Sequence, residues 1–242
     1  MARAFLNIVF LEKFLYMLTE ISKGDECMIV ASIMTKNPVC ITPDVSINDA
    51  RALMIKEQIT KLPVMNKNNE LVGLITKKDL MNAGPSVATS LDMYEISYLL
   101  SKVKVDKVMN KNVTTIQENE IIEEAARIME DNEIGCLPVM RGSMLVGIVT
   151  EKDLFKAFVV LFGARNEGVR ITFTLDEQPG QIARFTTAIF GKGGNFISLV
   201  TGEFEEDSNK RICACKVNNM NLKDIEAVLK ELEIGIIDIR KV

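Results

Sequence analysis

The chain has 242 residues, 48% of them hydrophobic and 26% charged, which is typical of one large or two ordinary globular domains. Its formal net charge of −4 argues against a nucleic-acid-binding protein, because such proteins usually carry a basic patch. The absence of histidine excludes Ser-His-Asp and Cys-His nucleophiles and every His-ligated metal site, and leaves acid-base chemistry to carboxylates, Lys or Tyr. Since the sequence shows no other nucleophilic or metal-binding constellation, we predict no catalytic residues and no metal site.

Residues 1–27 precede the first repeated element. Their apolar run, Phe5–Leu11, ends at Glu12 and Lys13 and is too short to cross a bilayer, and no A-x-A-like cleavage site follows it. Two alternatives stay open. The segment is either an N-terminal extension that packs on a partner as an amphipathic helix, or it is not translated, because Lys23-Gly24-Asp25 can be encoded by a ribosome-binding sequence just before Met28.

The chain then repeats itself, because residues 31–85 and 106–158 carry the same pattern at an offset of 75 and then 74 positions. Leu62-Pro63-Val64-Met65 returns as Leu137-Pro138-Val139-Met140, and Thr76-Lys77-Lys78-Asp79-Leu80 returns as Thr150-Glu151-Lys152-Asp153-Leu154. Two copies are too few for a solenoid, so we predict one pseudo-symmetric domain with ligand clefts between the copies.

Each copy is predicted to contain a strand, an amphipathic helix, two strands joined by a turn, and a second helix. The predicted ranges are 39–42, 47–57, 62–65 and 71–75 with a helix from Thr76, and 113–116, 121–132, 137–140 and 144–149 with a helix from Thr150. This β-α-β-β-α order, run twice, predicts an α/β domain in which helices cover small sheets.

The tetrads that begin the second helices, Thr76–Asp79 and Thr150–Asp153, allow two interpretations. In a capping box, the threonine caps the helix and the acid reaches back to the threonine amide. In a ligand site, the helix N-terminus meets a phosphate and the acid accepts ribose hydroxyls, with charge added by Lys77, Lys78 and Lys152. The preceding Gly73 and Gly147 favour the ligand site, since a glycine lets a ligand approach the backbone.

The run Ile59–Val64 followed by Gly73–Leu80 resembles a CBS motif, the copy that ends in Gly147–Leu154 resembles another, and the two together resemble a Bateman module. That family binds adenosine-containing nucleotides, so the resemblance implies AMP, ATP or S-adenosylmethionine as a regulatory ligand and no cofactor. It also implies the nucleotide-binding residues: Thr42, Ile59, Thr60, Pro63, Ile75, Thr76 and Asp79 in one cleft, and Thr115, Ile134, Pro138, Val149, Thr150 and Asp153 in the other. Gly135 stands where the first copy has Thr60, so the clefts need not bind equally.

The last third changes pattern. Strands are predicted over 169–175, 195–201, 211–217 and 235–239, with helices over 182–190 and 222–232, and this β-α-β-β-α-β order is ferredoxin-like. With Pro179-Gly180 in the first turn, the segment resembles an ACT domain. Many ACT domains only dimerise, and others bind amino acids at paired interfaces; the resemblance implies Asp176, Gly180, Gln181 and Asn195 as ligand residues.

The cysteines form no CxxC pair, and no convincing secretory signal precedes them, so they are typical of reduced thiols in a cytoplasmic protein. Cys213 and Cys215 stand two positions apart on one face of a predicted strand, where buried packing is favoured over metal binding.

The predicted organisation is an extension over 1–27, a CBS domain over 28–86, a linker helix over 87–104, a second CBS domain over 105–164 and an ACT domain over 168–242. This order resembles the AcuB-type acetoin-utilisation proteins. The resemblance implies a cytoplasmic, non-enzymatic regulator of carbon metabolism that acts on a protein the sequence does not identify.

Two alternatives to a sensor are a constitutive dimerisation or assembly module without a ligand and, less favoured, a nucleotide-consuming enzyme. Strand edges of the ACT-like sheet need pairing, and both families commonly form two-fold dimers, so we predict a homodimer. We predict no nucleic-acid partner and no membrane partner.

Overall fold

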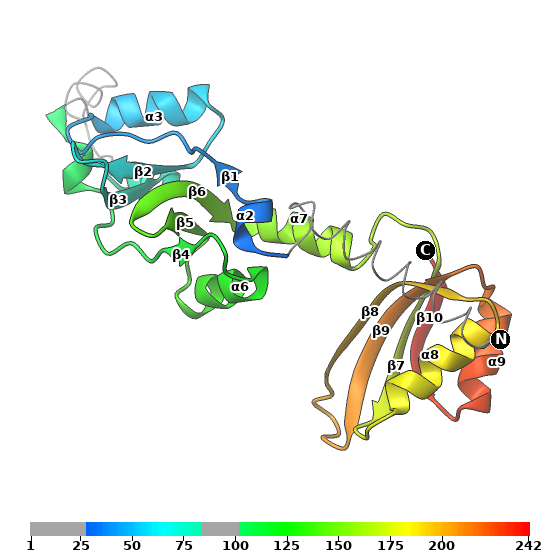
Figure 1. The fold of residues 1–242 in the computed structure, drawn as a ribbon. Helices are drawn as coiled ribbons and strands as arrows, with labels where there is room; N and C mark the ends of the chain where they lie inside the picture. Colours follow the sequence, from blue (N-terminus) through cyan, green and yellow to red (C-terminus); the bar gives the residue numbers. More distant parts are fainter. Residues whose placement is uncertain (1–27, 84–101) are drawn as a thin grey trace, which may run out of the picture. The chain divides into compact units, whose positions relative to one another are not determined.

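A computed structural model of the protein describes residues 28–83 and 102–242 (Figure 1). The chain divides into two compact units, one ending at Leu154 and one running from Phe155 to Val242. The extension predicted over 1–27 and most of the linker helix predicted over 87–104 lie outside the described residues. Within the described ranges, no helix is long and apolar enough to span a membrane.

The first unit contains the two copies in the predicted order. The first copy has α2 (Val30–Ile33), β1 (Thr35–Lys36), α3 (Ile47–Lys56), β2 (Lys61–Met65), β3 (Leu71–Thr76) and α4 (Lys77–Asn82). The second has a 3₁₀ turn (Val105–Lys107), β4 (Ile116–Gln117), α6 (Ile122–Asp131), β5 (Cys136–Arg141), β6 (Met144–Thr150) and α7 (Glu151–Leu161). The predicted mixed α/β fold is confirmed, with a four-stranded sheet, β1-β6-β5-β4, and a two-stranded sheet, β2-β3. Buried residues of α3 and α4 pack against β2 and β3, whereas α7 continues past Leu154 into the second unit.

The strand predicted over 39–42 is wrong in extent. Only Ile41 pairs, in parallel with Val64, through bonds from its amide to Pro63 O (3.1 Å) and from the Met65 amide to Ile41 O (2.8 Å). Pro38 and Pro43 flank this position, and a proline has no N–H to extend a ladder. The equivalent strand predicted over 113–116 likewise begins only at Ile116.

The spacing of apolar residues in α3 explains which face of the helix is buried. Ser46 caps the helix by accepting a hydrogen bond from the Asp49 amide (3.1 Å). Ile47, Ala50 and Met54 follow at helical spacing and are buried on the face that packs against β2 and β3.

The N-terminal segment of each copy pairs with strands of the other copy, and we call these the exchanged segments. Thr35 in β1 pairs with Ile148 in β6, and at the equivalent place Asn110 pairs with Leu74 in β3. The segments just before them are exchanged in the same way, since the Val30 amide donates to Glu120 O (2.8 Å). The two copies therefore form one pseudo-symmetric unit, because neither completes its backbone hydrogen bonds alone.

The glycines of the repeated Leu-Val-Gly sequence accommodate methionines rather than a ligand. A Cβ atom added at Gly73 would overlap Met109 Sδ, and one added at Gly147 would overlap Met34 Sδ and lie 3.1 Å from Thr35 O. The two methionines belong to the exchanged segments. The suggestion that these glycines open the backbone to a ligand is therefore corrected: they let the copies approach each other.

Replacing Gly147 by Ala is expected to reduce the free energy of unfolding by about 1–3 kcal/mol, because the added methyl overpacks this contact. Denaturant unfolding of the full chain would measure the loss. The double variant Gly147→Ala/Met34→Ala should recover part of it, and Gly191→Ala, where a Cβ would meet nothing within 4 Å, is the matched control. A single variant as stable as wild type would contradict the contact.

The second unit has β7 (Val169–Asp176), α8 (Gln181–Gly191), β8 (Asn195–Glu203), β9 (Lys210–Asn218), α9 (Leu222–Glu231) and β10 (Gly235–Lys241). Its antiparallel sheet has the order β10-β7-β9-β8, as the predicted ferredoxin-like fold requires. Alternate residues of β7 and β9, including Phe173 and both Cys213 and Cys215, pack against Phe185 of α8 and Leu229 of α9.

Lys216 binds the segment that follows α7, and all the residues of this contact belong to the second unit. It is 6% exposed, and its Nζ donates to Gly163 O (2.8 Å) and Asn166 O (2.9 Å). Gly163 has a φ of +56°, the left-handed conformation that commonly follows the last turn of a helix. The buried ammonium therefore satisfies carbonyls just beyond the C-terminal end of α7.

Candidate functional site

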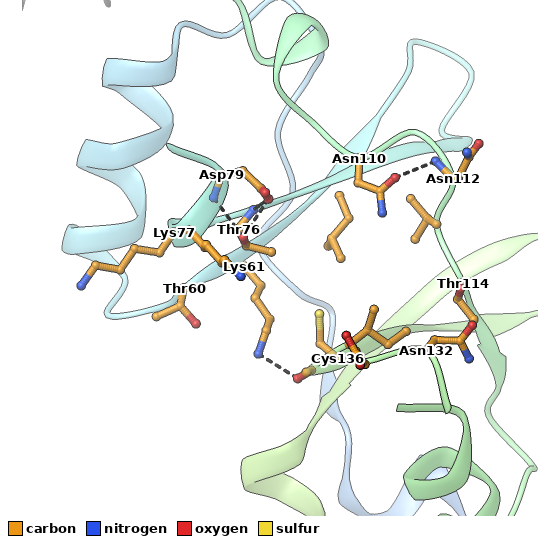
Figure 2. Close-up of a pocket in the computed structure, with 16 residues that line it drawn as sticks. Thr60, Lys61, Thr76, Lys77, Asp79, Asn110, Asn112, Thr114, Asn132 and Cys136 are labelled. Carbon is orange, nitrogen blue, oxygen red and sulfur yellow. Dashed lines mark hydrogen bonds between the residues drawn. The ribbon is translucent and has the colours of Figure 1, made fainter. Parts of the chain in front are cut away.

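A cavity of about 610 Å³ lies between the two copies of the first unit (Figure 2). Its volume is in the range of small-molecule sites. The first copy supplies the start of β2 and the junction of β3 with α4, and the second supplies its exchanged segment and the loop before β5. The lining residues are Thr60, Lys61, Leu74, Thr76, Lys77, Lys78, Asp79, Asn110, Asn112, Val113, Thr114, Asn132, Glu133, Ile134, Gly135 and Cys136.

Asp79 lies where β3 turns into α4, and its carboxylate has one engaged oxygen. The backbone amide of Thr76 (2.8 Å) and the Thr76 hydroxyl (2.7 Å) both donate to Oδ2, while the Asp79 amide donates to Thr76 Oγ1 (3.3 Å). The capping-box interpretation is therefore confirmed for this tetrad. Within the described part of the chain, Oδ1 has no hydrogen-bond partner, so capping leaves half of the carboxylate available to the cavity.

Lys61 spans the two copies. Its Nζ donates to Gly135 O (2.8 Å), a carbonyl that also accepts a bond from the Glu151 amide (3.4 Å) at the start of α7. Figure 2 shows the Lys61 side chain extending towards Cys136, whereas the Lys77 side chain points the other way. The Lys61 ammonium therefore lies at the wall of the cavity.

The cavity wall also contains Cys136, a buried residue. Burial raises the pKa of its thiol to about 11, although the nearby Lys61 ammonium acts in the opposite direction. The sulfur is therefore protonated at neutral pH and is a poor nucleophile. Together with Leu74, Val113 and Ile134, it makes part of the wall apolar.

The structure brings four of the residues expected at the nucleotide clefts together in this cavity: Thr60, Thr76, Asp79 and Ile134. Ile134 was expected in the other cleft, so the cavity combines residues from both expected sets. Sequence reasoning missed Lys61 and the polar residues of the exchanged segment. No local signal could have shown the segment, because its position depends on the pairing of Asn110 with Leu74.

Most of the other expected residues lie elsewhere. Pro63, Ile75, Pro138 and Val149 are buried within strands β2, β3, β5 and β6, and Thr42 and Thr115 are exposed outside the cavity lining. Ile59 lines a second cavity, of about 550 Å³, with residues of α3 and α4.

The second tetrad repeats the geometry of the first but is more deeply buried. The amide and hydroxyl of Thr150 donate to Asp153 Oδ2 at 3.1 and 2.7 Å. Asp153 is 7% exposed, and neither residue lines the cavity of Asp79. The aspartates of the two expected clefts therefore differ in burial, and only Asp79 lines this cavity.

In the second unit, the four residues expected at an ACT ligand site do not come together. Asp176, Gly180 and Gln181 lie where β7 leads into α8, whereas Asn195 begins β8, beyond the other end of this 11-residue helix. Such a helix is about 16 Å long. Asn195 instead lines a shallow hollow of about 350 Å³ with Phe190 and Phe196.

The chain matches two known families along its length. The CBS domain matches residues 30–86 and 105–160, and the TTHA0829-like ACT domain matches residues 167–240. Over 126 residues, 52% of this chain, it is 32% identical to a homoserine O-acetyltransferase of Methanohalobium evestigatum. The match spans only 23% of that enzyme's length.

This chain is also similar to solved structures. The AcuB protein of Vibrio cholerae is 29% identical, with 57% of this chain and 94% of that chain covered and a TM-score of 0.47. The CBS domain pair of protein MJ0100, in complex with 5′-methylthioadenosine and S-adenosyl-L-methionine, is 28% identical, with 57% and 98% covered and a TM-score of 0.46.

Proposed function

The chain contains a pair of CBS domains followed by a TTHA0829-like ACT domain, and on this premise we propose that it is a regulatory protein that binds an adenosine-containing nucleotide beside Asp79. One observation carries the proposal. Asp79 uses a single carboxylate oxygen to cap α4, and the residue lines a cavity of about 610 Å³. The capping and ligand interpretations are therefore compatible in one residue.

The chemistry of the lining suits the parts of a nucleoside. A carboxylate accepts hydrogen bonds from the vicinal hydroxyls of a ribose, and bonds to an ionised acceptor are about twice as strong as neutral ones. Leu74, Val113 and Ile134 supply an apolar surface for a base. Asn110 Oδ1 accepts from the Asn112 amide (2.9 Å) and Asn132 Nδ2 donates to Ile128 O (2.8 Å), so Asn110 offers mainly its amide donor and Asn132 its amide acceptor to a base edge.

We propose that the protein acts by binding rather than by catalysis. The Cys136 thiol is protonated at neutral pH because burial raises its pKa, so it is not an activated nucleophile. The proposal extends, by the family resemblance, to a cytoplasmic protein that controls carbon metabolism of the acetoin type through a protein still to be identified, and to an amino-acid ligand at the ACT domain.

A homodimer belongs to the same proposal. Strands β10 and β8 form the two edges of the ACT sheet, and β8 has nine residues. A long exposed edge is a template for pairing with another chain. The same feature supports the second candidate, a constitutive assembly module without a ligand.

Thermal melts with AMP, ATP and S-adenosylmethionine distinguish these candidates. A ligand at 100 times its dissociation constant stabilises the native state by about 2.7 kcal/mol, so at least one of the three should raise the melting temperature by several degrees. Guanosine monophosphate, with the same ribose and phosphate, tests the contribution of the base. A melt that none of the nucleotides shifts would favour the assembly module, and phosphate release would indicate a nucleotide-consuming enzyme.

A further inference from the structure

We infer that Lys61 selects the class of nucleotide: its ammonium binds a phosphate group, so the cavity favours anionic adenine nucleotides over the sulfonium cation S-adenosylmethionine. This inference rests on the proposed function, since it assigns the charge of the ligand in the same cavity. It concerns a residue outside the Thr76–Asp79 tetrad.

The hydrogen bonding of Lys61 carries the inference. An ammonium has three N–H donors, and one of them donates to Gly135 O at 2.8 Å. Among the described residues, the other two donors have no partner. A neutral carbonyl therefore orients the side chain across the cavity and leaves it able to donate to a ligand.

Among residues 28–83 and 102–242, no carboxylate forms an ion pair with Lys61. Asp79 and Glu133 line the same cavity, but neither forms an ion pair with Lys61 within the described part of the chain. The Asp79 carboxylate is instead bonded to the amide and hydroxyl of Thr76. The Glu151 carboxylate lies beside Gly135, with Oε2 3.0 Å from the place of a Cβ atom there, but among the described residues it forms no ion pair with Lys61. The ammonium therefore still attracts an anion and repels a second cation.

The side chains of Lys61 and Lys77 extend in different directions (Figure 2). Lys77 uses its backbone amide to donate to Thr60 O (2.8 Å), and its side chain points away from Lys61 (Figure 2). The ammonium of Lys61, by contrast, reaches the second copy. A phosphate bonded to Lys61 would thus lie between the two copies, beside Gly135 of the second copy.

Calorimetric titrations of the full-length protein with AMP, adenosine and S-adenosylmethionine test the inference. Wild type should bind AMP at least about tenfold more tightly than adenosine, because a charge-assisted bond to phosphate is worth about that factor or more. Lys61→Met should lose most of this preference while still binding adenosine, and Lys61→Arg should keep it. Lys67→Met, an exposed lysine in the turn of the same hairpin, is the control for loss of charge and should keep the preference.

The outcomes separate this inference from the function on which it rests. If wild type binds none of the three ligands, the proposed function fails. If wild type binds adenosine as tightly as AMP, or binds S-adenosylmethionine more tightly than AMP, the nucleotide site stands and the selection by Lys61 is overturned. The wild-type comparison alone distinguishes these outcomes, even if Lys61→Met does not fold. An AMP preference that persists in a folded Lys61→Met variant also overturns the role of Lys61.

Discussion

Replacing Asp79 by Asn is expected to weaken AMP binding at least about tenfold while changing the stability of the ligand-free protein only slightly. Bonds from ribose hydroxyls to the carboxylate are charge-assisted and worth about 1.5–3 kcal/mol, and the neutral amide loses most of this. The cap of α4 should largely survive, because the side-chain oxygen of Asn can still accept from the Thr76 amide, and cap substitutions of this kind cost about 1 kcal/mol or less. Calorimetric titration and melts without ligand measure the two effects separately.

The matched control is Asp49→Asn. Asp49 holds the same position in the first turn of α3, where Ser46 Oγ donates to Asp49 Oδ2 (2.6 Å), and it does not line the cavity. It should therefore reproduce the small loss of stability without any change in AMP affinity. Asp153→Asn should also leave the affinity at the Asp79 cavity unchanged, because Asp153 lies outside its lining. If Asp79→Asn behaved like Asp49→Asn, the acid would be a helix cap alone.

Those parts of the fold that depend on local pattern could be predicted from the sequence. The spacing of apolar residues predicted α3 over 47–57, and the structure has Ile47–Lys56. Alternation predicted the ACT strands with similar accuracy, as in β7 over Val169–Asp176. A capping box was one of the two interpretations of the Thr-x-x-Asp tetrad, and the geometry of Thr76 and Asp79 confirms it.

Long-range pairing could not be predicted in the same way. The exchange of N-terminal segments joins Thr35 to Ile148, far apart in the chain, and no pattern within either segment encodes the partner. This exchange brings Asn110, Asn112, Val113 and Thr114 to the cavity, so no local motif could predict that part of the candidate site.

The glycines and the ACT residues show a second reason. A small residue is required wherever any atom approaches the backbone closely, so Gly73 suited a ligand and the Met109 side chain equally well. Gly180 and Asn195 are close in sequence, yet a whole helix, α8, separates them in space. The residue type predicts a close approach or a turn at each of these positions. Only the structure shows which atoms approach Gly73 and how far apart Gly180 and Asn195 lie.

Replacing Phe185 by Ala is expected to destabilise the ACT unit by about 3–5 kcal/mol without changing nucleotide binding. Phe185 is fully buried on α8, with its ring 4.5 Å from that of Phe173 and 5.7 Å from that of Phe196. Removing it leaves a cavity at the centre of a core that contains only second-unit residues. Since a domain is typically stable by only about 5–15 kcal/mol, this loss is a large fraction of the total. Calorimetry of the full chain should show the second unit melting earlier, in a transition separate from that of the CBS unit.

The control for this experiment lies on the same helix. Phe190 is 78% exposed, so Phe190→Ala removes the same side chain without opening a core cavity and should change stability little. The AMP-induced rise of the CBS transition should be equal in wild type and both variants, because the Asp79 cavity and the Phe185 core lie in different units. If Phe185→Ala instead lowered both transitions together and abolished the AMP-induced rise, the two units would fold as one cooperative body, and nucleotide binding would depend on an intact ACT core. Equal losses in the two phenylalanine variants would show that the Phe185 ring is not the centre of that core.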